Sequence, residues 1–376
     1  MPELQDIFAQ HGEAYQVEHR LPPDQQKVIR AIRNCRTAAL GGHVDECDEC
    51  GFVRVSYNSC RNRHCPKCQT LTKERWIEAR KDDLLNVGYF HVVFTLPDLL
   101  NSVAYQNPKT VYGLLFKAAA ETLSELSADP KYLGAQIGFT GVLHTWGQNL
   151  MHHPHLHCIV SGGGLTSNGR WVNSRKKFFI PVKVLSRKFR GKFLHYLKQA
   201  KLEFYGSIVH LQEQSRFQDW MSTLYQKDWV VYCKPPFKNA GYVVEYLGRY
   251  THRVAISNQR IVNLKDGMVT FKWRDYRDNN QQKEMRLTAD EFIRRFLVHV
   301  LPTGFTRIRH YGLLSPRNKA TKLKLCKRLT KTVIRTSPIA KLSALEFLEK
   351  LTGRDFTVCP CCGMGHLRAS PEQGIA

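Results

Sequence analysis

The chain lacks the features that would place it in a membrane or outside the cell. No apolar run approaches the roughly 20 residues that cross a bilayer. Neither end reads as a basic amphipathic anchor, and the first residues do not have the pattern of a signal peptide. We therefore expect an intracellular protein with no membrane partner. Twelve cysteines in such a chain, several of them as Cys-x2-Cys, indicate metal sites rather than disulfides.

Acidic residues are scarce in this chain of 376 residues. Lys and Arg number 56 against 32 Asp and Glu, which gives a formal net charge of +24. The excess runs through segments that otherwise read as folded, so the phosphate backbone of a nucleic acid is the expected partner. The length suggests two or three domains with a sizeable core, and there is no tandem repeat of solenoid period.

Four histidines lie within residues 152–157, inside an apolar run that closes with three glycines. Read as a strand, this segment alternates its side chains between two faces. His155 and His157 then point the same way, about 7 Å apart at ~3.3 Å per residue, while Leu156 points into apolar packing. Two imidazoles on one face of a buried strand are suited to one divalent metal. A pair of ordinary surface or core histidines is the alternative, and four histidines in six residues favour the ligand pair.

Two imidazoles do not complete a coordination shell. An earlier strand, expected over 137–144, is joined to the histidine strand by a connection that suits antiparallel neighbours. That pairing would bring His144 or Gln148 near the metal. His153 and Glu245 are further candidates.

A second unusual stretch covers residues 241–253, where tyrosines recur every four residues. On a helix they share one face, and a row of arginines lies beside them, with guanidinium groups suited to phosphate. An amphipathic helix with an aromatic core stripe is the commoner meaning of this spacing, but polar phenols outnumber aliphatic residues on this face. The tyrosines are Tyr242, Tyr246 and Tyr250, and the arginines are Arg249 and Arg253.

Together, the histidine strand and the tyrosine helix resemble the rolling-circle transposases of the bacterial insertion sequence 91 family, which are two-tyrosine members of the HUH endonucleases. The resemblance runs from about residue 30 to about residue 365. The combination of motifs is far more specific than any one of them. Besides the two stretches already described, it rests on residues 39–43, 59–69, 229–232, 234–237 and 309–314.

The resemblance implies an enzyme of rolling-circle transposition. Such an enzyme nicks and rejoins single-stranded DNA, at the element's ends and at the target, through 5′-phosphotyrosine intermediates. Tyr246 and Tyr250 occupy the family's two tyrosine positions, and His155 and His157 occupy its metal-binding pair. Mg²⁺ or Mn²⁺ is the implied catalytic ion, although imidazole ligands alone do not exclude zinc. The implied location is the bacterial cytoplasm, in association with the nucleoid.

The implied fold class is α+β. The family's catalytic core is an antiparallel sheet with packed helices, of the ferredoxin-like or RNA-recognition type, and the alternation of strands and helices over 89–300 is compatible with it. A plasmid replication initiator and a non-catalytic, zinc-dependent DNA-binding regulator stay open as alternative functions. The absence of a recognisable helicase motif favours transposition over the first alternative. The oligomeric state is not indicated by the sequence.

An N-terminal zinc ribbon is predicted from two Cys-x2-Cys pairs. Cys47 with Cys50 and Cys65 with Cys68 are separated by 14 residues, close to the spacing of a four-thiolate zinc site. Zinc would fold a segment too small for a core of its own. The surrounding cysteines and histidines form either a second Cys2His2 site or buried groups and partners of the ligands. They are Cys35, His43, Cys60 and His64.

Basic residues around the cysteines indicate that this module binds DNA, with a purely structural role as the alternative. The residues singled out are Arg61, Arg63 and Lys67. Near the other end, Cys359 and Cys362 resemble half a zinc site with no evident second half. The expected organisation is a zinc-binding DNA-binding domain over 1–85, a nuclease domain over 86–300 and a basic C-terminal region over 301–376.

Overall fold

The chain folds into two units, each built from segments that are distant in sequence. The computed structural model describes residues 1–175, 180–234, 243, 246, 248, 254–276, 278–333 and 342–370. The first unit comprises Met1–Ala79, His252–Val300 and Thr336–Ala376, and the second comprises Arg80–Thr251 and Leu301–Arg335.

This division differs from the three consecutive regions expected from the sequence. The boundary expected at residue 85 lies close to the observed change of unit after Ala79. The expected nuclease domain, 86–300, is divided, because its last part packs with the N-terminal helices. The expected C-terminal region, 301–376, is shared between the two units.

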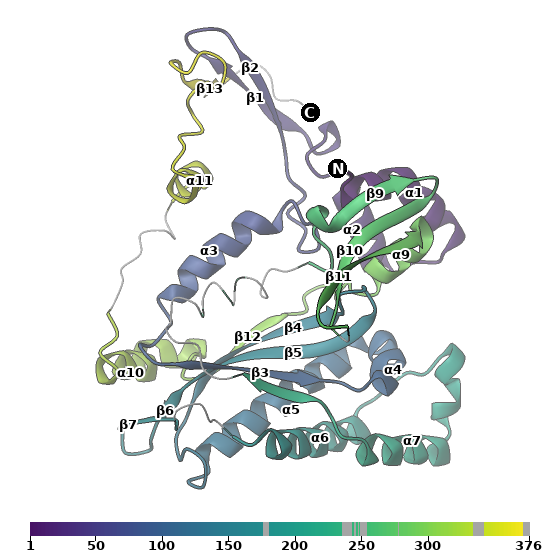
Figure 1. Cartoon of the computed structure of the whole chain (residues 1–376), viewed down its shortest axis with the longest axis vertical. Coiled ribbons are helices and arrows are strands. Elements are labelled where there is room, and N and C mark those ends of the chain that lie inside the picture. The colour runs from purple at the N-terminus through teal and green to yellow at the C-terminus, as the bar shows by residue number, and fades with distance from the viewer. Residues whose placement is uncertain are drawn as a thin grey trace. The chain divides into compact units, whose positions relative to one another are not determined.

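The second unit is built on a five-stranded antiparallel sheet with the strand order β12-β4-β5-β3-β8 (Figure 1). The pairing of the expected strand over 137–144 with the histidine strand is confirmed, since β4 and β5 are antiparallel neighbours. The strands are β3 (Tyr89–Thr95), β4 (Gly138–Trp146), β5 (His152–Ser161), β8 (Val231–Lys234) and β12 (Ile308–Gly312).

Helices cover one face of this sheet, as Figure 1 shows for α5 and α6. Because side chains alternate along a strand, Phe94 of β3 and Leu156 of β5 point into one apolar core, and each is at most 1 % exposed. Each such side chain contributes about 1.5–3 kcal/mol through burial. The opposite face is left for polar side chains. The helices are α4 (Asn101–Gln106), α5 (Pro108–Ala128), α6 (Val182–Gln199) and α7 (Gln214–Gln226).

Smaller elements complete the second unit. A turn at Asn168 and Gly169 joins β6 (Gly163–Leu165) to β7 (Trp171–Asn173), and Gly169 adopts a positive φ of 76° there. A π-helical turn, η6 (Lys319–Leu323), leads into α10 (Lys324–Leu329). The short 3₁₀ helices of this unit are η2 (Asp98–Leu100), η3 (Gly206–Gln212) and η5 (Pro316–Asn318).

The first unit contains a helical part with its own three-stranded sheet, β11-β10-β9. β9 and β10 form a hairpin, and Thr288 caps the helix after β11, accepting the Glu291 backbone N–H at 3.2 Å. Phe8 packs edge-on against Phe296, with ring centroids 5.5 Å apart. The elements are α1 (Leu4–Glu18), α2 (Pro23–Arg33), η4 (Asn258–Arg260), β9 (Ile261–Lys265), β10 (Met268–Asp275), β11 (Gln281–Thr288) and α9 (Ala289–Leu297).

A second small sheet of this unit pairs the hairpin over 42–57 with residues 367–369, in the order β13-β1-β2. Along the chain, the change of unit after Ala79 falls within α3 (Gln69–Lys81). None of the helices among the described residues is both long and apolar enough to span a bilayer. The remaining elements are η1 (Ala38–Leu40), β1 (Gly42–Cys47), β2 (Val53–Tyr57), α11 (Ala344–Thr352) and β13 (Leu367–Ala369).

Candidate functional site

Three histidines meet on the polar face of the five-stranded sheet. The candidate ligand nitrogens of His144, His155 and His157 all lie within 4.8 Å of one another. Strand pairing explains this arrangement, because His144 of β4 is directly opposite His155 of β5, and His157 follows two residues later on the same face. His144 and His157 are almost fully buried, whereas His155 is half-buried. Their spacing and chemistry suit a divalent metal ion.

Hydrogen bonds orient two of these rings. His155 Nδ1 lies 2.6 Å from the backbone oxygen of His153. A carbonyl oxygen only accepts, so Nδ1 carries the proton and Nε2 keeps the lone pair that a metal needs. His157 Nδ1 lies 2.8 Å from His91 Nε2. Outer contacts of this kind fix the tautomer and the direction of a ligating imidazole.

His91 extends the cluster toward a tyrosine. It lies on β3 opposite Ile159 of β5, so it shares the face of His157. Its Nδ1 is 3.0 Å from the phenol oxygen of Tyr246, and its ring centroid is 5.1 Å from that of Tyr246. Burial, with smaller contributions from Lys234 and His155, lowers the pKa of His91 to about 4, so the ring is neutral at pH 7. A hydrogen-bonded chain thus connects Tyr246, His91 and His157.

A further histidine lies along the same face, on β12. His310 Nδ1 is 2.9 Å from the hydroxyl oxygen of Thr140, and its Nε2 is 3.4 Å from Arg80 Nη1. A guanidinium only donates, so Nε2 accepts and the neutral imidazole donates through Nδ1 to Thr140. Burial, followed by Arg80 and Lys319, lowers the pKa of His310 to about 4, against an opposing effect of Asp83.

Eight cysteines of the first unit form two clusters of four, neither of which includes a histidine. One contains Cys35, Cys60, Cys65 and Cys68, with Sγ–Sγ distances of 3.5 Å, 3.6 Å and 3.7 Å for three of its pairs. The other contains Cys47, Cys50, Cys359 and Cys362. Four convergent thiols are the ligand set of a structural zinc site.

The single four-cysteine site expected from the sequence is therefore wrong. The β1–β2 hairpin explains why Cys47 and Cys50 do not join Cys65 and Cys68. Cys47 and Cys50 lie at the tip of this hairpin. Cys35 and Cys60 follow α2 and β2, at its opposite end, where Arg36 donates its backbone N–H to the Asn58 backbone oxygen at 3.0 Å. The five or six residues of each strand extend roughly 15–20 Å, so one ion cannot bind at both ends.

Comparisons with known proteins identify the family of this chain. Residues 138–322 match a family model described as "Putative transposase", and residues 7–96 match one described as "Transposase zinc-binding domain". The chain is 51 % identical over 375 residues to "Putative transposase y4qJ" of Sinorhizobium fredii, covering 97 % of this chain and 94 % of the relative. The chain belongs to the insertion sequence 91 family of transposases.

A more distant relative supports the same family. The transposase is 29 % identical over 297 residues to "Transposase for insertion sequence element IS801" of Pseudomonas savastanoi pv. phaseolicola, covering 77 % of this chain and 70 % of the relative. No solved structure matches the chain. The match to the zinc-binding family and the thiol clusters together support structural zinc in this transposase.

The other expected metal ligands are placed as follows. His153 is outside the histidine cluster, since its Nδ1 faces Asp98 at 4.0 Å. Gln148 lies in the turn between β4 and β5.

Neither His43 nor His64 joins a cysteine cluster, and His43 Nε2 lies 3.7 Å from Asp45. The expected Cys2His2 alternative is therefore wrong, because the partners of Cys35 and Cys60 are two further thiols. Several predicted residues fall outside the described part of the chain, namely Tyr242, Glu245, Arg249, Tyr250 and Arg253.

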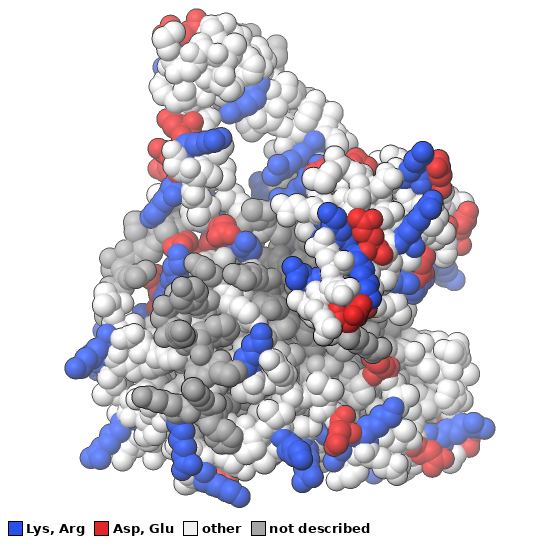
Figure 2. Space-filling model, in the orientation of Figure 1, with Lys and Arg blue, Asp and Glu red and all other residues white. Residues whose placement is uncertain are grey.

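The basic residues proposed to contact DNA differ in their surroundings. Lys67 is held within the first unit by an ion pair with Glu3 and by a hydrogen bond of 2.7 Å to Gln5. Arg63 is half-buried, and burial lowers its pKa, whereas Arg61 is exposed. On the face drawn in Figure 2, the Lys and Arg side chains are spread out rather than gathered in one patch. Arg61 is therefore the most accessible of the three for a phosphate group.

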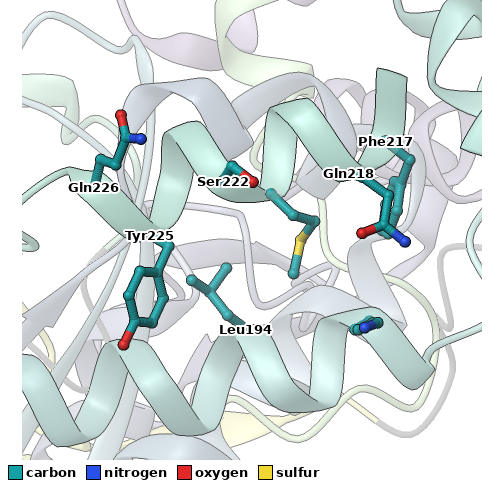
Figure 3. Close-up of a pocket in the computed structure, with 8 residues that line it drawn as sticks. Leu194, Phe217, Gln218, Ser222, Tyr225 and Gln226 are labelled. Carbon is teal, nitrogen blue, oxygen red and sulfur yellow. The ribbon is translucent and has the colours of Figure 1, made fainter. Parts of the chain in front are cut away.

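A separate pocket lies between α6 and α7, with a volume of about 370 Å³ (Figure 3). Leu194 and Phe217 belong to or pack against the apolar core beneath the sheet, so the pocket is on the helix-covered side, opposite the histidines. Its polar lining consists mostly of amides and hydroxyls, such as Gln218 and Ser222. It contributes nothing to the candidate metal site.

Two features of the site were not predicted from the sequence. His91 stands alone in an otherwise apolar strand, so only the register between β3 and β5 shows that it shares the histidine face. The cysteine pair that completes the cluster of Cys47 and Cys50, namely Cys359 with Cys362, lies more than 300 residues away in the sequence. A signal for it was present, however, because only the pairs at 47–50 and 359–362 are followed directly by glycine.

Proposed function

We propose that this transposase nicks and rejoins single-stranded DNA at the ends of its element and at the target, using Tyr246 as a nucleophile beside a metal ion held by histidines. One observation carries the proposal. The phenol of Tyr246 is hydrogen-bonded to His91, and His91 is hydrogen-bonded to His157 of the three-histidine cluster. A tyrosine and a candidate metal site on one sheet face form the minimal apparatus of a metal-dependent DNA-nicking enzyme.

The histidine cluster fits some divalent ions better than others. His144, His155 and His157 offer three imidazole nitrogens, a donor set that suits transition metals. Mg²⁺ prefers oxygen ligands, so Mn²⁺ is the better match of the two ions that the family resemblance implies. A bound cation would polarise a non-bridging phosphate oxygen and stabilise charge on the leaving 3′ oxygen.

His91 would set the ionisation of the tyrosine. If His157 uses Nε2 as a ligand, its Nδ1 keeps a proton and donates it to His91 Nε2. A neutral His91 then has its own proton on Nδ1 and donates it to the phenol oxygen of Tyr246. Such a hydrogen bond stabilises the phenolate, which is the nucleophilic form.

The nicking step balances without an external energy source. The phenolate oxygen of Tyr246 attacks phosphorus, the bond from phosphorus to the 3′ oxygen breaks, and that oxygen takes up a proton. The product is a 5′-phosphotyrosine and a free 3′ hydroxyl, so the phosphodiester energy is retained. A 3′ hydroxyl later attacks the same phosphorus and releases the phenolate, whose conjugate acid has a pKa near 10. Tyr250 is the proposed second nucleophile, for the other strand end.

The remaining parts of the proposal concern the DNA and its surroundings. The zinc-binding module, with Arg61 exposed beside its cysteines, would hold DNA of the element's end. Arg249 and Arg253 would contact phosphates next to the tyrosines. The protein would act in the bacterial cytoplasm on nucleoid DNA.

The test is adduct formation on labelled single strands that contain an element end, with Mn²⁺ present. We expect a protein–DNA adduct that survives denaturation and carries the label of a 3′-end-labelled strand. A 5′-end label should appear on a short product with a free 3′ hydroxyl. Trypsin cleaves after Arg249 and so separates Tyr246 from Tyr250, and fragment ions should place a nucleotide on Tyr246.

The tyrosine variants decide between the candidate functions. Tyr246→Phe should lose the adduct on its peptide, and Tyr246→Phe combined with Tyr250→Phe should form none while still binding DNA. A replication initiator would cut an origin strand rather than the element's ends. An adduct at wild-type level in the double variant, or DNA binding with no adduct in the wild type, would overturn the proposal.

A further inference from the structure

The second cysteine cluster brings together two pairs of residues that lie more than 300 positions apart in the chain. Cys47 Sγ lies 3.8 Å from Cys362 Sγ, and Cys50 Sγ lies 3.7 Å from Cys359 Sγ. Tetrahedral zinc with bonds of about 2.3 Å places its sulfurs about 3.8 Å apart. A disulfide would require about 2.05 Å. The spacing is therefore that of four thiolates around one ion.

The two halves of this cluster have the same local shape. In each, a Cys-x2-Cys pair is followed by a glycine in the left-handed region, Gly51 with φ 67° and Gly363 with φ 69°. Each glycine donates its backbone N–H to the carbonyl oxygen of the first cysteine, at 3.2 Å and 3.0 Å respectively. Cys65 and Cys68 lack this turn, because the residue after Cys68 begins α3. The two glycine-ended turns thus form a matched pair.

Backbone donors already point at the sulfurs of the C-terminal half. The N–H of Cys361 lies 3.4 Å from Cys359 Sγ, and the N–H of Gly365 lies 3.3 Å from Cys362 Sγ. Donation to sulfur favours the thiolate, the form that binds metal. A Cβ on Gly365 would come within 2.5 Å of Cys47 Sγ, so the two turns approach as closely as a shared ion requires.

The surrounding structure is too small to hold itself together. Its buried apolar residues are Cys47, Cys359 and Leu367, with Phe52 and Cys362 packed at the edge. Strand β13 adds three residues to β1, and Arg368 pairs with Asp48 at 2.9 Å. A three-residue strand and one exposed ion pair supply little stability. A structural metal is the usual means of stabilising so small a fold.

We propose that Cys47, Cys50, Cys359 and Cys362 bind a second structural zinc ion, which joins the segment 355–370 to the tip of the β1–β2 hairpin. The transposase then carries two tetrathiolate zinc sites. The Cys359 and Cys362 half lies beyond both matched family models, which end at residues 96 and 322. The zinc-binding module is thereby completed by the C-terminal end of the described chain.

The first measurement is the zinc content of the full-length protein, purified under reducing conditions, by mass spectrometry of the metal. Cys359→Ser combined with Cys362→Ser should lower the content by one zinc per chain. Cys361→Ser is the matched control, because Cys361 is exposed, lies between the two ligands and is outside the cluster. It should retain the wild-type content. An unchanged zinc content in the double variant would overturn the proposal.

The second measurement uses the unmodified sequence, so it does not depend on whether a variant folds. After exchange of zinc for ¹¹³Cd, we expect two signals in the tetrathiolate region of the cadmium spectrum. This region excludes any cadmium bound by imidazoles of the histidine cluster. A single tetrathiolate signal would contradict the second site, as would a disulfide among these four cysteines under reducing conditions. Neither readout involves DNA cleavage, so the outcome is independent of the proposed nuclease activity.

Discussion

The cysteine clusters and the histidine cluster are two different arrangements of candidate metal ligands in one chain. Each cysteine cluster brings four thiols together from turns and short strands, which fills a tetrahedral shell with protein ligands. The histidine cluster offers three nitrogens from β4 and β5, which leaves coordination positions for a substrate. The cluster of Cys47, Cys50, Cys359 and Cys362 lies where apolar burial is slight, whereas the histidines lie on a sheet with a large core beneath it. We propose that folding depends on the ion at the cysteine clusters, whereas under the proposed function the chemistry depends on an ion at the histidine cluster.

Removing one ligand from each kind of site should show most clearly whether the two kinds differ in their effects on folding and on activity. Cys65→Ala should lose one zinc and unfold the N-terminal module, since structural zinc contributes on the order of 10 kcal/mol of apparent binding free energy. His155→Ala should melt within a few degrees of the wild type, because His155 is half-buried and its strand is held by the core, yet Mn²⁺-dependent nicking should be lost. Circular dichroism, zinc analysis and the adduct assay report these outcomes.

A third variant controls for the loss of a buried thiol as such. Cys158 is fully buried on the apolar face of β5 and belongs to neither cluster. Cys158→Ala should cost about 1 kcal/mol through lost packing and retain all the zinc. If Cys65→Ala behaved like Cys158→Ala, or if His155→Ala unfolded the protein, the distinction between the two kinds of site would be wrong.

The sequence predicted the sheet better than the metal sites. Two-residue alternation over 152–160 predicted one strand, and a short connection predicted its antiparallel pairing with the strand expected over 137–144. This pairing was enough to suggest His144 near His155. These signals are local, because a two-residue period and a short turn are read within about twenty residues.

The features that the sequence did not reveal depend on contacts between distant segments. Spacing alone favoured a single zinc site shared by the Cys47–Cys50 and Cys65–Cys68 pairs. The β1–β2 hairpin instead holds the two pairs apart, so they belong to different clusters. Cys359 finds its partners only when β13 pairs with β1. His91 joins the site only through the register of β3 against β5. In each case the sequence contained the residues, and tertiary pairing decided their neighbours.

The contact between His91 and Tyr246 gives the next prediction. His91→Phe removes both ring nitrogens, so the rate of adduct formation should fall by about 10–100-fold, the usual cost of losing an outer partner at a metal site. The pH–rate profile should also shift to higher pH, since the phenolate loses a donor. His91→Gln, which can still donate an N–H, should recover part of the rate. A wild-type rate and profile in His91→Phe would show that His91 does not act on the tyrosine.

The smallest expected effect concerns His310, whose hydrogen bonds stabilise the five-stranded sheet without any ion. His310 accepts from Arg80 and donates to Thr140, and its pKa is lowered to about 4, against an ordinary value of 6.5. As the pH falls from 6.5 to 4, the unfolded chain binds a proton at this residue before the folded chain does. Stability is therefore lost in that window, by about 1–2 kcal/mol after allowance for partial exposure.

The variant His310→Gln isolates this contribution. An amide can accept from Arg80 and donate to Thr140 as the neutral imidazole does, yet it does not titrate. Urea unfolding of the zinc-loaded protein at several pH values between 7 and 4 should show a shallower decline for the variant than for the wild type. Other partly buried histidines, such as His152 with its pKa lowered to about 4, contribute equally to both proteins and cancel in the difference. Parallel declines would mean that the hydrogen bonds of His310 do not exclude its charged form.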